Sequence, residues 1–138
     1  WDVVRNQANK NLHFSVLKTI AAFLNSNGGT LIIGVEDNGA IFGLDHDLHT
    51  LGDPSLDAFQ QTLMNLVYEY IGAQFAPFIK VRFEEVEDHA VCVVEADKAA
   101  EPAFVGSPRG KEFFARMGNT TRSLDPEETV QFIQTSWE

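Results

Sequence analysis

Apolar residues recur at the three- and four-residue spacing of an amphipathic helix in three stretches of the chain. The first covers residues 11–24, with Asn11 as a candidate N-cap and the Asn-Ser-Asn-Gly-Gly run at 25–29 as its stop. The second opens at Asp53-Pro54 and closes at Gly72, because Asp caps free N–H groups and Pro is tolerated in the first turn. The third opens at Asp125-Pro126, so the pattern predicts three helices.

Short apolar or alternating runs predict strands between these helices. Residues 30–35 (TLIIGV) are too few for a helix, and the turn Asp37-Asn38-Gly39 leads into residues 40–44, which predicts a β-hairpin. Residues 79–84 alternate between apolar and charged side chains, as in a strand with one solvated face, and residues 90–96 and 112–117 predict two further strands. Residues 106–110 and 118–121 are expected to form an exposed loop and a polar turn.

The predicted order is helix, two strands, helix, three strands, helix. Consecutive antiparallel strands joined by short turns indicate an α+β fold with one mixed, mostly antiparallel sheet and helices on one face. A chain of 138 residues with 44% apolar side chains is long enough for a single domain with its own core. Because the chain begins at Trp1, we expect it to be a fragment of a longer protein.

Charge and cysteine content limit the function classes. The 20 Asp and Glu residues outnumber the 10 Lys and Arg residues, and a net charge of −10 excludes indiscriminate coating of nucleic acid or anionic membranes. The single Cys92 excludes a disulfide scaffold, and the chain contains neither a membrane-length apolar run nor a signal pattern at its start. These features predict a cytoplasmic protein without a membrane partner.

The basic residues are concentrated in one stretch. Residues 103–124 carry a net charge of +3, and the rest of the chain carries −13. Arginine forks, hydroxyl groups and amides are the groups that contact phosphodiesters, so this stretch supplies the candidate nucleic-acid-binding residues: Arg109, Lys111, Arg116, Asn119, Thr120, Thr121 and Arg122. The alternative is that these cations only pair with the acidic remainder of the chain.

The glycine-rich run at residues 25–34 is not a phosphate loop, since it follows a helix, precedes a strand and lacks the Lys-Ser/Thr pair. We expect Gly28 and Gly29 to supply positive φ at a helix C-cap. Glu36 and Asp37, after the first strand, are candidate metal ligands or simply turn residues. The acidic and histidine-containing loop at 45–49 is interpreted as a solvated loop rather than a metal site.

Two segments, residues 18–45 (KTIAAFLNSNGGTLIIGVEDNGAIFGLD) and 113–128 (FFARMGNTTRSLDPEE), resemble the Schlafen AlbA-like DNA-binding domain family. The resemblance implies a Schlafen-core, Alba-like α+β domain that binds DNA or RNA and is often fused in bacteria to a helix-turn-helix or other regulatory region. Such proteins are commonly described as transcriptional regulators, defence-type proteins or divergent ATPases. The motif positions in this chain are Asn25, Gly28, Gly29, Gly34, Gly39 and Gly118.

The resemblance also raises a nuclease alternative. Some Schlafen cores cut transfer or ribosomal RNA with three carboxylates, and their aspartate corresponds to Asp37 of this sequence. The two glutamates have no counterpart, since residues 1–14 contain no Glu, and Mg or Mn would be required only under this alternative.

The sequence therefore leaves three hypotheses. The first is a non-catalytic nucleic-acid-binding module without a cofactor, which uses one small basic face. The second is a divalent-metal ribonuclease whose glutamates lie upstream of the fragment. The third is a homo-oligomerisation or protein-interaction module, in which strand edges and opposite charges bring copies together.

Overall fold

The computed structural model describes residues 2–34, 55–87, 89–107 and 110–137. Its helices and strands follow in this order: α1 (Asp2–Asn25), β1 (Gly29–Gly34), α3 (Ser55–Tyr70), the 3-10 helix η2 (Ala73–Phe78), β2 (Ile79–Val86), β3 (His89–Ala96), β4 (Phe104–Ser107), β5 (Gly110–Met117), β6 (Thr120–Leu124) and α4 (Pro126–Ser136). The α+β class predicted from the sequence is confirmed.

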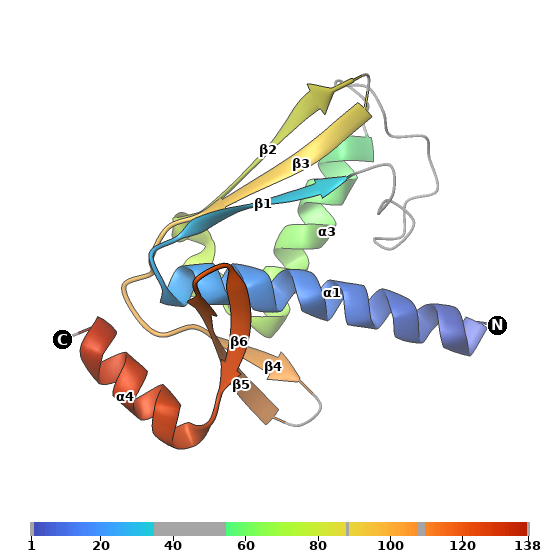
Figure 1. The fold of residues 1–138 in the computed structure, drawn as a ribbon. Helices are drawn as coiled ribbons and strands as arrows, with labels where there is room; N and C mark the ends of the chain where they lie inside the picture. Colours follow the sequence, from blue (N-terminus) through green and yellow to red (C-terminus); the bar gives the residue numbers. More distant parts are fainter. Residues whose placement is uncertain (1, 35–54, 88, 108–109, 138) are drawn as a thin grey trace.

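Within the described ranges, the strands form two separate antiparallel sheets of three strands each, in place of the single mixed sheet that the sequence predicts. Sheet A has the order β1-β3-β2, and sheet B has the order β4-β5-β6. In sheet A, Ile33 and Phe83 both lie opposite Cys92, which makes β3 the central strand. The segment between β3 and β4 carries the chain from one sheet to the other, so continuous pairing stops there (Figure 1).

Helix α1 runs between the two sheets (Figure 1). Its apolar side packs into the main core with α3 and with the inner face of sheet A, where alternate residues such as Ile33, Cys92 and Val94 are buried. The core also includes Phe114 of β5, whose ring meets the ring of Phe14 edge to face at 5.8 Å. One helix therefore joins both sheets to a common core.

Sheet B is covered by α1 on one face and by α4 on the other, so the expectation of helices on a single face is wrong. Phe113, Ala115 and Leu124 form a second, smaller buried cluster under α4. Asp125 begins α4 with a complete capping box, in which its side chain accepts from the Glu128 backbone and its own N–H donates to the Glu128 carboxylate. At the other end Trp137 donates from Nε1 to the Ala99 carbonyl at 2.9 Å.

Most predicted elements are present with shifted ends. The first helix begins at Asp2 rather than Asn11, because residues 2–10 contain neither Gly nor Pro to stop it. The 3-10 helix before β2 was not predicted, and its Pro77 explains why no regular helical pattern marks it. No helix of the described residues has the length and apolarity needed to cross a membrane.

Residues 106, 107 and 110 of the predicted loop and residues 120 and 121 of the predicted polar turn belong to strands, which corrects the sequence interpretation in part; residues 108 and 109 lie outside the described residues. Gly106 pairs with Lys111 in the β4–β5 ladder, and Thr121 pairs with Arg116 in the β5–β6 ladder. Both flanking strands are short, β4 with four residues (FVGS) and β6 with five (TTRSL), so neither offers the longer alternating pattern that predicts a strand. Only the turn around Gly118, with φ of 67°, remains as predicted.

Of the predicted hairpin at residues 30–44, the structure describes the first strand as β1. The turn at 37–39, including Gly39, and the strand at 40–44 lie outside the described residues. Gly34 is the last residue of β1, where it pairs with Val91.

Cys92 is fully buried in the middle of β3, and burial raises the pKa of its thiol to about 12, well above the usual range of a free thiol. The native thiol should therefore resist alkylation at pH 8 and react only when the protein unfolds, as mass spectrometry after iodoacetamide treatment would show. Because only the unfolded thiol ionises between pH 9 and about 12, stability should fall with rising pH in that window. Cys92→Ala should lose this part of the pH dependence.

Candidate nucleic-acid interface

The hairpin of β5 and β6 carries most of the predicted basic site. Alternate residues of β5 point to opposite faces of sheet B, so Phe114 and Arg116 face α1, whereas Phe113 and Ala115 face α4. Residues opposite each other in neighbouring strands share a face, so Thr121 joins Arg116 on the α1 side. This alternation decides which of the predicted residues can act together.

Arg116 is held at the end of α1 by three contacts. Its guanidinium lies over the Phe23 ring at 5.1 Å, and its Nη1 donates to Thr121 Oγ1 at 2.9 Å. Its backbone N–H donates to Ser26 Oγ at 3.0 Å. All three partners are uncharged, and among the described residues no carboxylate pairs with Arg116. The side chain is therefore fixed in place while its positive charge is not neutralised by an ion pair.

Arg122 lies on the opposite face of sheet B, across from Ala115. Its Nη2 is 3.8 Å from Glu128 Oε2, and the exposed fractions of the two side chains are 61% and 42%. Such an exposed pair contributes little stability, but the carboxylate offsets much of the local positive potential. Arg116 and Arg122 therefore do not form the single basic face that the sequence suggested.

Lys111 is exposed near the far end of β5, and within the described ranges no hydrogen bond or ion pair engages it. It lies five positions before Arg116, which corresponds to roughly 17 Å along a strand. Arg109 lies outside the described residues. The structure thus spreads the cations along and across the hairpin.

The turn between β5 and β6 exposes polar groups next to the hydrogen-bonded side chains of Arg116 and Thr121. Gly118 takes the positive φ of the first turn position, and Asn119 follows it. Thr120 Oγ1 donates to Asn119 Oδ1 at 3.3 Å, and both residues are exposed. Of the predicted residues, Arg116 and Thr121 lie together on the α1 side, and Asn119 and Thr120 adjoin them at the turn, where Thr120 pairs with Met117 on the α4 side.

The side chain of Asn25 fixes the C-terminal end of α1 against sheet B, next to Arg116. The side chain is fully buried and makes three hydrogen bonds: Nδ2 donates to the carbonyls of Ala103 and Phe114, both at 2.8 Å, and Oδ1 accepts from the Ala103 N–H at 2.7 Å. These contacts join α1 to β5 and to the residue before β4. Phe23 and Ser26, which flank Asn25, consequently meet Arg116.

Gly28 and Gly29 have different roles, which corrects their common interpretation as positive-φ residues. Gly28 has φ of 80°, and its N–H donates to the Phe23 carbonyl at 3.1 Å at the end of α1. Gly29 begins β1 without a positive φ, and a Cβ there would lie 2.5 Å from the Phe23 ring. Glycine at 29 is required by close approach to the ring that also supports Arg116.

The sequence did not identify Phe23 and Ser26 as supporting residues. Ser26 lies 90 positions from Arg116 in the chain, so no spacing pattern links them. Phe23 reads as one more apolar residue of an amphipathic helix. A pairing of this kind is detectable only from the fold.

The candidate metal and catalytic residues Glu36 and Asp37, and the loop at 45–49, lie outside the described residues. Within the described ranges, no group of three or more His, Cys, Asp or Glu side chains is arranged to hold a metal ion. The nuclease alternative therefore stays a prediction.

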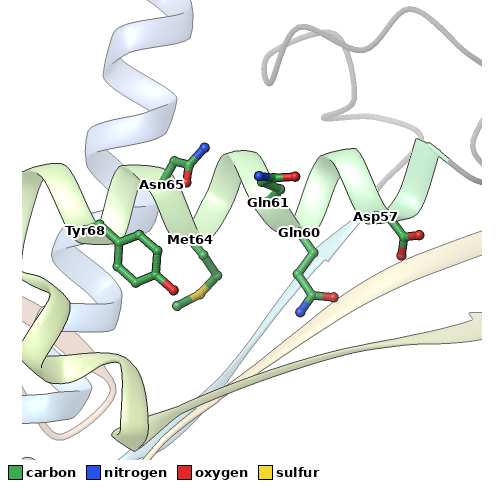
Figure 2. A pocket seen from close by; sticks show the side chains of 6 residues that line it. All are labelled: Asp57, Gln60, Gln61, Met64, Asn65 and Tyr68. Carbon is green, nitrogen blue, oxygen red and sulfur yellow. The ribbon is translucent and has the colours of Figure 1, made fainter.

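A shallow groove of about 360 Å³ runs along the exposed side of α3, away from the β5–β6 hairpin. Figure 2 shows the side chains that line it, all from α3: Asp57, Gln60, Gln61, Met64, Asn65 and Tyr68. None of them is basic. The groove therefore does not extend the candidate nucleic-acid interface.

Comparison with known proteins places these features in a family context. A family model described as Schlafen, AlbA_2 matches residues 3–125. The chain also resembles a solved structure, the DIP2311 protein from Corynebacterium diphtheriae, with a TM-score of 0.55 and 22% sequence identity. The match covers 90% of this chain and 22% of that protein, so it supports the fold, and the chain spans about a fifth of the larger protein's length.

Proposed function

Because the chain belongs to the Schlafen AlbA_2 family, we propose that it binds nucleic acid, DNA or RNA, through the turn and adjoining residues of the β5–β6 hairpin. Arg116 and Thr121 would contact backbone phosphates, and Asn119 and Thr120 at the turn would donate further hydrogen bonds. The proposal is a binding role without catalysis. A cytoplasmic setting belongs to the same proposal.

The observation that carries the proposal is the environment of Arg116. The guanidinium is fixed by the Phe23 ring and the Thr121 hydroxyl, and in the described part of the chain it has no acidic partner. A positioned arginine loses less side-chain entropy when it binds a phosphate than a free one, and it contributes its full charge. Arg82, by comparison, is already paired with Glu84 and Glu95.

The net charge of −10 sets the expected strength of binding. Repulsion between the acidic body and the phosphate backbone opposes the few favourable contacts, so affinity should be low and strongly salt-dependent. With no more than about four phosphate contacts, the slope of log K against log salt should be no steeper than about −3.6 for duplex DNA.

The test is a set of fluorescence anisotropy titrations of duplex DNA and single-stranded RNA at several salt concentrations. Arg116→Gln should weaken binding to every sequence and reduce the salt slope by about 0.9 for duplex DNA or 0.7 for single strands. Arg116→Lys keeps the charge and should keep most of the slope. Arg82→Gln removes the same charge from sheet A and serves as the matched control, measured at chain concentrations at which the wild type is monomeric by sedimentation.

Two results would overturn the proposal. One is the absence of measurable affinity for DNA or RNA at low salt. The other is an equal loss of affinity in Arg82→Gln and Arg116→Gln, which would indicate that only the overall charge matters. Unfolding curves of the variants distinguish lost contacts from lost structure.

A further inference from the structure

Among the described strands, β2 lies at one edge of sheet A and β1 at the other. In the part of the chain that the structure describes, no strand pairs with the outer side of β2. A free edge of eight residues is a template for another strand. We propose that two copies of this chain pair through the outer edges of β2, antiparallel and about a twofold axis at Phe83, which joins the two copies of sheet A into one continuous sheet.

The hydrogen bonds of sheet A show which groups of β2 are available. The N–H of Asp97 donates to the Phe78 carbonyl at 2.9 Å, so this pair is of the hydrogen-bonded type. Pairs alternate along an antiparallel ladder, and the backbone groups of Val81, Phe83 and Glu85 therefore point away from β3. Pairing of a second copy must use these three residues.

The side chains of β2 select one register for a second copy. With the axis at Phe83, Val81 lies opposite the second copy's Glu85, and Arg82 lies opposite its Glu84. The Arg82–Glu84 pairs are non-hydrogen-bonded pairs, in which facing side chains are closest, and symmetry produces two of them. The edge is thus complementary in charge to itself.

The neighbouring registers are unfavourable. A shift of two residues in one direction places Arg82 opposite the second copy's Arg82, and the opposite shift places Glu84 opposite Glu84. A shift of one residue would turn the apolar side of one strand toward the solvated side of the other. Repulsion between like charges and the mismatch of strand faces therefore exclude these registers and favour the one centred on Phe83.

The same register covers apolar surface that is open in one copy. Phe83, half-buried against the Phe59 ring at 6.0 Å between centroids, would meet its counterpart across the axis. Val86, 51% exposed, would lie opposite Lys80, whose aliphatic stem can cover it. Phe83 would thus continue the inner apolar face of sheet A across the axis, whereas Val86 and Lys80 would meet on the outer, solvated face.

The first test uses complementary charge variants in sedimentation equilibrium without nucleic acid. The wild-type chain should approach twice its 15.3 kDa mass with rising concentration. Arg82→Glu and Glu84→Arg should each stay monomeric, because each places like charges opposite one another. An equimolar mixture of the two should recover the dimer, since only the mixed pair restores opposite charges.

The mixture separates pairing between copies from the ion pair within one chain. Arg82 Nη2 and Glu84 Oε2 are 2.8 Å apart within one copy, and each single variant breaks this contact. Recovery in the mixture therefore reports only contacts between copies. A wild-type chain that stays monomeric at all concentrations, single variants that dimerise like the wild type, or a mixture that stays monomeric would each overturn the proposal.

A backbone variant provides a second test that does not depend on charge pairing. Glu85→Pro removes an N–H that points away from β3, so the chain should fold, as far-UV circular dichroism would show, but remain monomeric. Glu84→Pro removes an N–H of the β2–β3 ladder and should unfold sheet A. A folded Glu85→Pro variant that still dimerises would overturn the proposed edge.

Discussion

Replacing Asn25 with alanine is expected to lower the free energy of unfolding by about 3–5 kcal/mol. The substitution leaves the Ala103 N–H and the carbonyls of Ala103 and Phe114 without their partners in a site closed to water. Each buried polar group left unpaired costs about 1–3 kcal/mol. Urea unfolding followed by circular dichroism would measure the loss.

Two further variants separate hydrogen bonding from side-chain volume. Asn25→Asp keeps the shape of the side chain but cannot donate to the two carbonyls when ionised, so we expect a loss at least as large as that of alanine. Asn119→Ala removes an exposed asparagine and should change stability by less than about 0.5 kcal/mol. A loss below about 1 kcal/mol in Asn25→Ala would show that the three hydrogen bonds do not support the fold.

Gly28→Ala is expected to cost at least about 3 kcal/mol, because two penalties add at this position. The residue has φ of 80°, and a Cβ would lie 2.6 Å from the carbonyl oxygen of Ala96 in β3. That oxygen belongs to the backbone at the end of a central strand, so it cannot rotate away as a flexible side chain would.

Gly118→Ala is the matched control for this prediction. Gly118 also has a positive φ, 67°, but nothing lies within 4 Å of a Cβ added there. Gly118→Ala should lower the free energy of unfolding only by the conformational penalty of a positive φ, about 1–2 kcal/mol. Equal losses in the two variants, measured by thermal or urea unfolding, would mean that the contact with Ala96 relaxes at no cost.

Both predictions concern the C-terminal end of α1, which connects the two sheets. Besides the bonds of Asn25, the Leu24 carbonyl accepts from the Ala99 N–H at 2.8 Å. The adjacent Phe23 and Ser26 hold Arg116. Nucleic-acid affinity of Asn25 and Gly28 variants should therefore fall even where they remain folded, because the support of Arg116 is loosened.

The sequence indicates which segment of the chain carries the candidate site, but it does not show which side chains of that segment share one surface. The excess of cations between residues 103 and 124 falls on the strands β4 to β6. The register then separates Arg116 from Arg122 onto opposite faces, and Glu128 lies beside only the second of them. The strands β4 and β6, which flank β5, were not predicted. Without them the sequence does not show on which face of the sheet each side chain lies.

The sequence by itself determined the α+β class, the helix starting at Asp125-Pro126 and the strands at 79–84 and 90–96, because caps, turns and periodic burial are local signals; the structure extends the two strands to 79–86 and 89–96. Only the tertiary structure decided that there are two sheets, that α1 lies between them and that Asn25 and Ser26 meet residues some 80–90 positions away. Those contacts satisfy buried polar groups across the core, and a partner so far along the chain leaves no mark on local spacing.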